Sequence, residues 1–198
     1  MENQNDKGID GAAAVQQTGG KLLVRDVVFL AVISAVTLLT CSIMPLVAGV
    51  PLFGLPHLVT GLQLGLFYAI GIMKVRKTGA LLLMALFTGV IQLMMAPVMF
   101  LSNIFCGIII EAVIYFTSRG FKSTLSVFLA AALFNPLSLP FNYFYNLAVG
   151  KGNLAEVVSS QPWIAVLMSL AVVTVTAAGA LAGIKIAGEL KKSGALKR

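Results

Sequence analysis

Six long apolar runs, joined by short connections, take up most of this 198-residue chain. They cover approximately residues 23–46, 54–73, 78–97, 99–118, 125–148 and 162–188. A helix needs about 20 apolar residues to cross a hydrocarbon core about 30 Å thick, and each run has about that length. Backbone polar groups in a bilayer must be paired within their own segment, and the runs lack the alternation of a membrane β-barrel. The pattern predicts an all-α polytopic membrane protein with six transmembrane helices.

The basic residues predict how these helices are oriented. Thirteen of the fourteen Lys and Arg residues lie before the first run, between the second and third, between the fourth and fifth, or at the end of the sixth. The other three connections hold only Lys151. Basic residues in short loops stay on the cytoplasmic side during insertion, so both termini are expected to be cytoplasmic. The connection over 46–57, with its prolines and glycines, is then expected to form an external cap between the first two helices.

Composition leaves no room for a separate soluble domain. Hydrophobic residues make up 59% of the chain and charged residues 11%, whereas soluble domains carry about 25% charged residues. We expect a flexible cytoplasmic tail over 1–20, a six-helix transmembrane domain over 21–190, and a basic cytoplasmic tail over 191–198. The first tail lacks the basic start and short apolar core of a cleaved signal peptide, so the first helix is expected to be retained.

Two broad classes of function are disfavoured. The net charge of +7 follows from topology and from attraction to anionic inner-leaflet lipids, and no basic face interleaved with aromatics points to nucleic acid. The chain has no P-loop, and its single histidine and few carboxylates do not converge as an enzyme site requires. No catalytic residue, cofactor or metal site is expected. Cys41 and Cys106, inside apolar runs, are expected to be small buried hydrophobic residues.

A set of uncharged polar and aromatic residues lies at the predicted outer ends of the helices. Asn142 and Asn146 are four residues apart and share a helix face, and Asn135 lies one heptad earlier beside Pro136 and Pro140. Amides and phenols suit an organic ligand with ring heteroatoms or carbonyls, whereas an inorganic ion calls for carboxylates or rings of carbonyls. The predicted substrate-binding residues are Asn142, Asn146, Tyr143, Tyr145, Asn103, Gln92 and His57.

Each of these residues also has a purely structural interpretation. Tyr143 and Tyr145 are equally compatible with an aromatic belt at the membrane surface, and a transmembrane Asn often bonds to a neighbouring helix. His57 fits either a ligand contact or a cap of the second helix. Glu111 fits a ligand contact, a proton relay, or a structural pair with Arg119 at the inner surface, and its distance from the outer polar residues favours the structural role. The small residues over 176–183 are expected to permit close helix contact.

The chain resembles the S components of energy-coupling factor (ECF) transporters. Both have six spans in about 200 residues, and the resemblance rests on Ala31-Val-Ile-Ser-Ala35 early in the first span. Val24-Arg-Asp26 before it and Lys74-Val-Arg-Lys-Thr-Gly-Ala80 before the third span are closest to the S-component group labelled Trep_Strep. The resemblance covers roughly residues 21–190.

The resemblance implies a substrate-capturing subunit of an ATP-driven vitamin or micronutrient importer in a prokaryotic cell membrane. Ligand would bind near the external face, and Ala31 and Ala35 would dock on a transmembrane coupling subunit that is driven by two ATPase subunits. No motif singles out one vitamin. His57 and nearby methionines leave a tetrapyrrole open as the ligand.

Two other classes compete with this interpretation. A self-sufficient secondary transporter or channel for a small organic solute would be supported by an inverted repeat, and the two halves of the chain differ in proline placement. A structural or assembly subunit without a ligand would use the outer polar residues only to join helices.

Overall fold

The computed structural model describes residues 22–43, 47, 53–149 and 158–194. Its helices of 14 or more residues fall on the six apolar runs, and the described part of the chain contains no strand. The predicted N-terminal tail, most of the predicted external cap, and Lys151 lie outside the described residues. The helices are α1 Val24–Thr40, which continues as the 3₁₀ helix η1 Cys41–Ile43, then α3 Leu55–Val75, α4 Ala80–Leu93, α5 Pro97–Ser118, α6 Thr124–Val149 and α8 Pro162–Lys192.

Five of these helices are long and apolar enough to cross a membrane: α1 with η1, α3, α5, α6 and α8. The exception is α4, which has 14 residues and is therefore about 21 Å long at 1.5 Å per residue. The predicted third run extends to 97, but the helix stops at Leu93. Pro97 begins α5, and the residue before it, Ala96, is extended, as a residue preceding proline prefers to be. The turn before Pro97 thus shortens the third helix.

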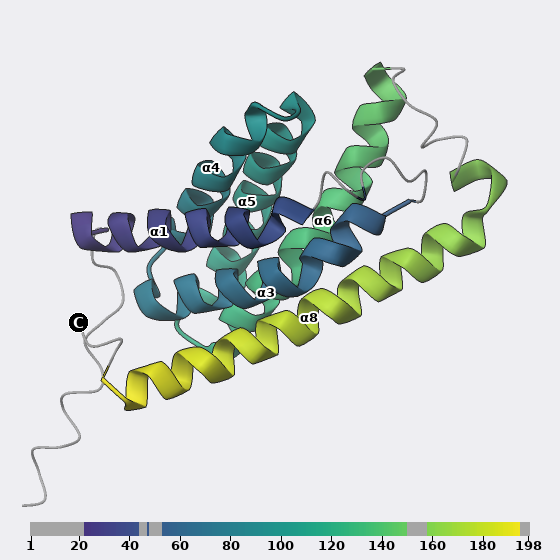
Figure 1. The fold of residues 1–198 in the computed structure, drawn as a ribbon. Coiled ribbons are helices and arrows are strands. Elements are labelled where there is room, and N and C mark those ends of the chain that lie inside the picture. The colour runs from purple at the N-terminus through teal and green to yellow at the C-terminus, as the bar shows by residue number, and fades with distance from the viewer. Residues whose placement is uncertain (1–21, 44–46, 48–52, 150–157, 195–198) are drawn as a thin grey trace, which may run out of the picture.

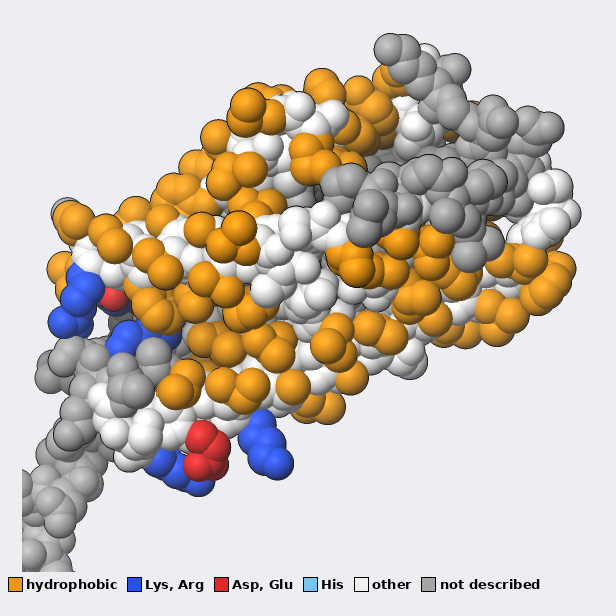
Figure 2. Space-filling model, in the orientation of Figure 1, with side chains coloured by type: hydrophobic (Ala, Val, Ile, Leu, Met, Phe, Trp, Pro, Cys, Tyr) orange, Lys and Arg blue, Asp and Glu red, His pale blue; other side chains and the backbone are white. Residues whose placement is uncertain are grey.

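The helices alternate in direction, so that α1 begins and α8 ends at the same end of the molecule (Figure 1). Figure 2 shows Lys and Arg side chains gathered at this end of the visible face. We call it the basic end, and the opposite end the far end. The described basic residues of the basic end include Arg25, Lys74, Arg76, Lys77, Arg119, Lys122, Lys191 and Lys192.

The closest helix pair is α3 with α8, and glycines on both helices make it possible. Gly61 and Gly65 on α3 lie against Thr176 of α8, and Gly179 and Gly183 on α8 lie against the backbone of Leu62 and Leu66 on α3. A Cβ atom on Gly65 would overlap the backbone carbonyl of Thr176, and one on Gly179 would overlap that of Leu62. Small residues let helix backbones approach in this way within membranes. The predicted close contact through 176–183 is confirmed.

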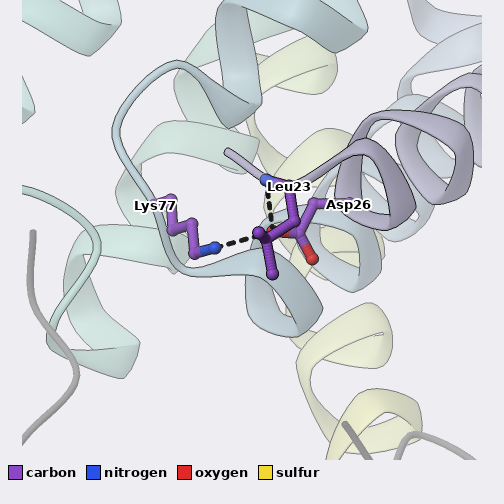
Figure 3. Close-up of polar contacts among 3 residues, drawn as sticks. All are labelled: Leu23, Asp26 and Lys77. Atoms are coloured by element: carbon purple, nitrogen blue, oxygen red, sulfur yellow. Dashed lines mark hydrogen bonds and ion pairs between the residues drawn. The ribbon is translucent and has the colours of Figure 1, made fainter. Parts of the chain in front are cut away.

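The turn between α3 and α4 is held from two sides at the basic end. Lys77 Nζ lies 2.8 Å from Asp26 Oδ2 on α1, and the same oxygen accepts a hydrogen bond from the backbone N–H of Leu23 (Figure 3). From the other side, the buried carboxylate of Glu111 on α5 accepts hydrogen bonds from the backbone N–H groups of Gly79 and Leu82. Glu111 therefore caps the N-terminus of α4.

This corrects the partner expected for Glu111. The structural role is as predicted, but among the described residues no ion pair joins Glu111 to Arg119. The first N–H groups of a helix lack intrahelical partners, and the helix dipole favours a negative charge beside them. The backbone N–H groups at the α4 N-terminus thus take the place of the Arg119 guanidinium group as the partner of Glu111. Nothing in the pattern of charges indicated this contact, because it joins residues that are 29 and 32 positions apart in the chain.

Candidate ligand-binding site

A hydrogen-bonded cluster at the far end joins α3, α6 and α8. Its centre is Asn135, which is almost fully buried on α6. The amide nitrogen of Asn135 lies 2.8 Å from the backbone carbonyl oxygen of His57 and 3.2 Å from Thr176 Oγ1 on α8. The amide oxygen lies 3.0 Å from His57 Nδ1. We call these residues, together with Ser138 and Asn142, the His57 cluster.

The cluster determines which nitrogen of His57 carries the proton. A carbonyl oxygen only accepts hydrogen bonds, so the side of the Asn135 amide that faces the His57 carbonyl has to be the NH₂ group. Its oxygen therefore faces Nδ1, and Nδ1 must be the protonated ring nitrogen. Ser138 Oγ lies 3.1 Å from the same Nδ1 and donates to the Asn135 carbonyl at 2.6 Å. The Nε2 atom is left with a free lone pair in the neutral ring.

Asn142 lies one α6 heptad beyond Asn135 and faces that lone pair. Its amide nitrogen is 3.1 Å from His57 Nε2, so the amide N–H donates to the ring. The Asn146 amide in turn donates to the Asn142 backbone carbonyl at 2.7 Å. The predicted shared face of the two amides is thus present, and His57 on α3 lies against it. Asn142 and Asn146 are both partly exposed.

Gln92 and Asn103 form a separate cluster between α4 and α5. The Asn103 amide nitrogen lies 2.5 Å from Gln92 Oε1 and 2.7 Å from the Met99 carbonyl. Asn103 Oδ1 is 3.4 Å from Thr88 Oγ1, which lies 2.9 Å from the buried hydroxyl of Tyr68 on α3. The predicted site residues His57 and Asn142 thus lie in one polar cluster, and Gln92 and Asn103 lie in another.

The hydrogen bonds of the two clusters, within the described part of the chain, do not involve the two predicted tyrosines. Tyr143 and Tyr145 are both partly exposed on the last turns of α6, and the Tyr143 ring meets Phe144 edge to face at 5.6 Å. The predicted anchor Trp163 is exposed near the start of α8. Met94 and Met95 are exposed at the end of α4, while Cys41 and Cys106 are buried free cysteines, as predicted.

Sequence reasoning missed Ser138 and Thr176 as members of the His57 cluster. Ser138 lies between Pro136 and Pro140, and Thr176 lies in the small-residue stretch of α8. The usable signal was spacing: Asn135, Ser138 and Asn142 follow one another at three and four residues, which places them on one helix face. The partner helix of that face was not visible in the sequence.

Chemically, the two clusters offer only neutral donors and acceptors. The hydrogen bonds named above involve amide, hydroxyl, imidazole and backbone groups and no carboxylate, ammonium or guanidinium group. No three His, Cys, Asp or Glu side chains in the described part of the chain are placed to hold a metal ion. Such a set is suited to an uncharged organic molecule that exchanges hydrogen bonds with it.

The predicted docking residues lie on α1, and they differ in exposure. Leu30, Ser34 and Thr37 form the buried face of this helix. Ala35 is exposed together with Val28, Val32 and Leu39, whereas Ala31 is partly covered at the border of the two faces. The exposed face is apolar throughout this stretch.

Comparison with known protein families gives one match, over nearly the whole described region. Residues 24–192, from the start of α1 to the end of α8, match the Trep_Strep family model, which is described as a hypothetical bacterial integral membrane protein. No curated protein and no solved structure matches the chain.

Proposed function

Because the chain belongs to the Trep_Strep family of hypothetical bacterial integral membrane proteins, we propose that it is a substrate-capturing subunit of an importer of the ECF type. In this proposal it lies in the bacterial cytoplasmic membrane with its basic end and both termini inside. It binds a vitamin or related micronutrient at the far end, which faces outward. ATP hydrolysis belongs to partner subunits.

The orientation rests on the distribution of basic residues. The turns that precede α4 and follow α5 both carry arginine and lysine at the basic end, and positively charged short loops favour the cytoplasmic side. Since α3 ends and α5 ends at this same end, α4 has to carry the chain back to the far end. The proposal therefore counts α4 as a sixth, short crossing.

The observation that carries the proposal is the His57 cluster. A membrane protein that needs only helix packing has little use for a neutral histidine, two asparagines and two hydroxyls at one junction, because transmembrane hydrogen bonds contribute only about 0.6 kcal/mol on average. Polar side chains inside membranes commonly mark substrate paths. The partly exposed Asn142 and Asn146 extend this polar junction along α6.

The tautomer of His57 narrows the ligand class. Nε2 is an acceptor, so a ligand that takes the place of Asn142 has to present an N–H or O–H group. The Asn142 amide, once released, offers the ligand both a donor and an acceptor. These features fit a neutral, nitrogen- or oxygen-bearing ring compound and disfavour a strongly anionic one, whose charge would meet no described cation in the cluster.

The proposed partners are a transmembrane coupling subunit and two ATPase subunits. The apolar face of α1 around Ala35, with Ala31 at its border, is the proposed contact with the coupling subunit. Small side chains there allow a second helix to approach closely.

Native mass spectrometry of the protein purified in mild detergent tests the proposal. We expect a bound small molecule that is lost after Asn142→Ala and retained after Gly188→Ala, a change at a glycine whose added Cβ would meet no neighbour within 4 Å. Two results together would contradict the proposed role in substrate capture. One is that the purified protein carries no small molecule, and the other is that deletion of its gene leaves micronutrient uptake unchanged.

A structural or assembly subunit is the second candidate, and one observation favours it. Both ring nitrogens of His57 already have partners within the protein, so the cluster is satisfied without a ligand. Native mass spectrometry distinguishes the two candidates. An assembly role predicts that Asn142→Ala destabilises the fold and that the unaltered protein carries no ligand.

A further inference from the structure

The outer part of α6 differs from the rest of that helix in how it is attached. Every buried residue of α6 lies between Ser126 and Leu139. From Pro140 to Val149 the side chains are exposed or only partly covered. In Figure 1 the last turns of α6 rise away from α8 at the far end. We call residues 140–149 the α6 arm.

The junction between the buried part of α6 and the arm is weakened at three positions. Pro136 and Pro140 each lack the N–H that would bond to the carbonyl four residues earlier, so the carbonyls of Ala132 and Pro136 lose their helical partners. Ser138, between the prolines, donates to the Asn135 carbonyl at 2.6 Å, a type of side-chain bond that bends helices. Kinks in long helices arise at such positions.

One hydrogen bond and one aromatic contact join the arm to α3 and α5. Asn142 donates to His57 Nε2 on α3 at 3.1 Å, and the Phe141 ring lies 5.0 Å from the ring of Phe105 on α5. The two aromatic rings can shift against each other and stay in contact, whereas the hydrogen bond is lost when its donor and acceptor move out of line. Among the described residues, the hydrogen bond of the Asn146 side chain stays within the arm, to the Asn142 carbonyl.

From this arrangement we infer that the α6 arm is a hinged segment, with its hinge at 136–140, and that the His57–Asn142 hydrogen bond is the latch that holds it against α3. Release of the latch uncovers His57 Nε2, the acceptor that the proposed ligand would use. The hinge and latch are properties of the protein without ligand, so their test does not depend on the proposed function.

Pulsed electron paramagnetic resonance on spin-labelled protein in nanodiscs tests the latch. Cys41 and Cys106 are replaced by Ala, and labels are placed at the exposed positions Leu147 on the arm and Val166 on α8. We expect one narrow distance distribution for the otherwise unaltered protein. His57→Ala and Asn142→Ala should each broaden and shift it, and the double variant should do no more than His57→Ala alone, because that change already removes the His57–Asn142 bond.

Two comparisons separate a hinge from general loosening. Gln92→Ala, which breaks the other polar cluster, should leave the Leu147–Val166 distribution unchanged. A second label pair at the exposed positions Leu62 on α3 and Glu189 on α8 reports on these two helices themselves, and its distance distribution should stay unchanged in every variant. Replacing Pro136 and Pro140 with Ala in the His57→Ala protein should narrow the arm distribution again by restoring a continuous helix.

The inference is overturned by either of two results. One is an arm distribution that stays narrow and unshifted in both His57→Ala and Asn142→Ala. The other is an equal change in the Leu62–Glu189 pair, which would place the loosening in the whole bundle instead of at the hinge.

Discussion

Glu111 on α5 accepts a hydrogen bond from the backbone N–H of Gly79, the residue that precedes the first turn of α4. A second N–H, that of Leu82, bonds to the other carboxylate oxygen at 3.2 Å. The carboxylate and the helix N-terminus therefore satisfy each other within an otherwise apolar environment. These two bonds fix the start of α4 against α5.

Replacing Glu111 with Ala should lower the free energy of unfolding by about 1–3 kcal/mol, because it leaves buried N–H groups unsatisfied. Glu111→Gln keeps one acceptor oxygen and should cost less. Thermal unfolding in detergent measures both. Ligand affinity should remain nearly unchanged in Glu111→Gln, since the cap lies at the basic end; a large loss of affinity would show that the carboxylate takes part in binding.

The Asp26–Lys77 pair predicts a measurable coupling between α1 and the α3–α4 turn. The two side chains are mostly covered, with 15% and 20% of their surfaces exposed, so the pair is screened less than a surface pair. A double-mutant cycle with Asp26→Asn and Lys77→Gln should give a coupling energy of about 0.5–1 kcal/mol. A coupling of zero would mean that the basic end is held by Glu111 and packing alone.

The α3–α8 contact predicts that glycine substitutions differ sharply along one helix. Gly179→Leu places a side chain into the Leu62 backbone and should destabilise by about 1–3 kcal/mol or more. Gly188→Leu, nine residues further along α8, should be nearly neutral because a Cβ there has no neighbour within 4 Å. Comparable melting temperatures for the two variants would contradict backbone-to-backbone packing.

The sequence predicts the features of this structure that depend on residues close together in the chain, and it does not predict those that depend on contacts between helices. Apolar runs are local, and they located every long helix; proline chemistry, also local, explains why α4 ends at Leu93. The division of the polar residues into two clusters was not predictable, because it depends on which helices are neighbours. Gln92 and His57 were both predicted to line one outer site, yet one contacts α5 and the other α6.

The same limit explains Glu111 and Asn135. Burial of an ionisable or amide side chain in an apolar run indicates that a partner exists. The partner itself is a backbone N–H or a histidine on another helix, and no periodicity in the chain encodes it. Asn135 was recognised as sharing the face of Asn142, but its role in setting the His57 tautomer follows only from the packed geometry.

If the His57 cluster binds the ligand, Asn142→Ala should weaken binding by about 1–3 kcal/mol, roughly tenfold to a hundredfold in Kd, because it leaves a buried partner unpaired. Asn146→Ala should have an effect of the same sign, since its amide is next along the same face. Isothermal titration with the ligand identified by mass spectrometry measures both. Gln92→Ala is the matched control, and a larger loss there would move the site to the α4–α5 cluster.

The α1 face provides the last prediction. Ala35→Trp puts a large side chain on an exposed apolar surface, where it has room in the isolated protein, but it would block the close approach of a partner helix. We expect co-purification of the coupling and ATPase subunits with the tagged protein to be lost, while ligand binding stays intact. Ala31→Trp should act in the same direction, with some loss of stability because Ala31 is partly covered.

Ala178→Trp on α8 is the matched control for this experiment, because Ala178 is likewise an exposed alanine in an apolar helix. It adds the same bulk to a different surface and should leave the complex intact. Equal loss of partners from both variants would mean that tryptophan disturbs insertion in general. Retention of partners in Ala35→Trp would place the docking surface elsewhere on the bundle, since a small-residue contact does not survive the addition of an indole ring at its centre.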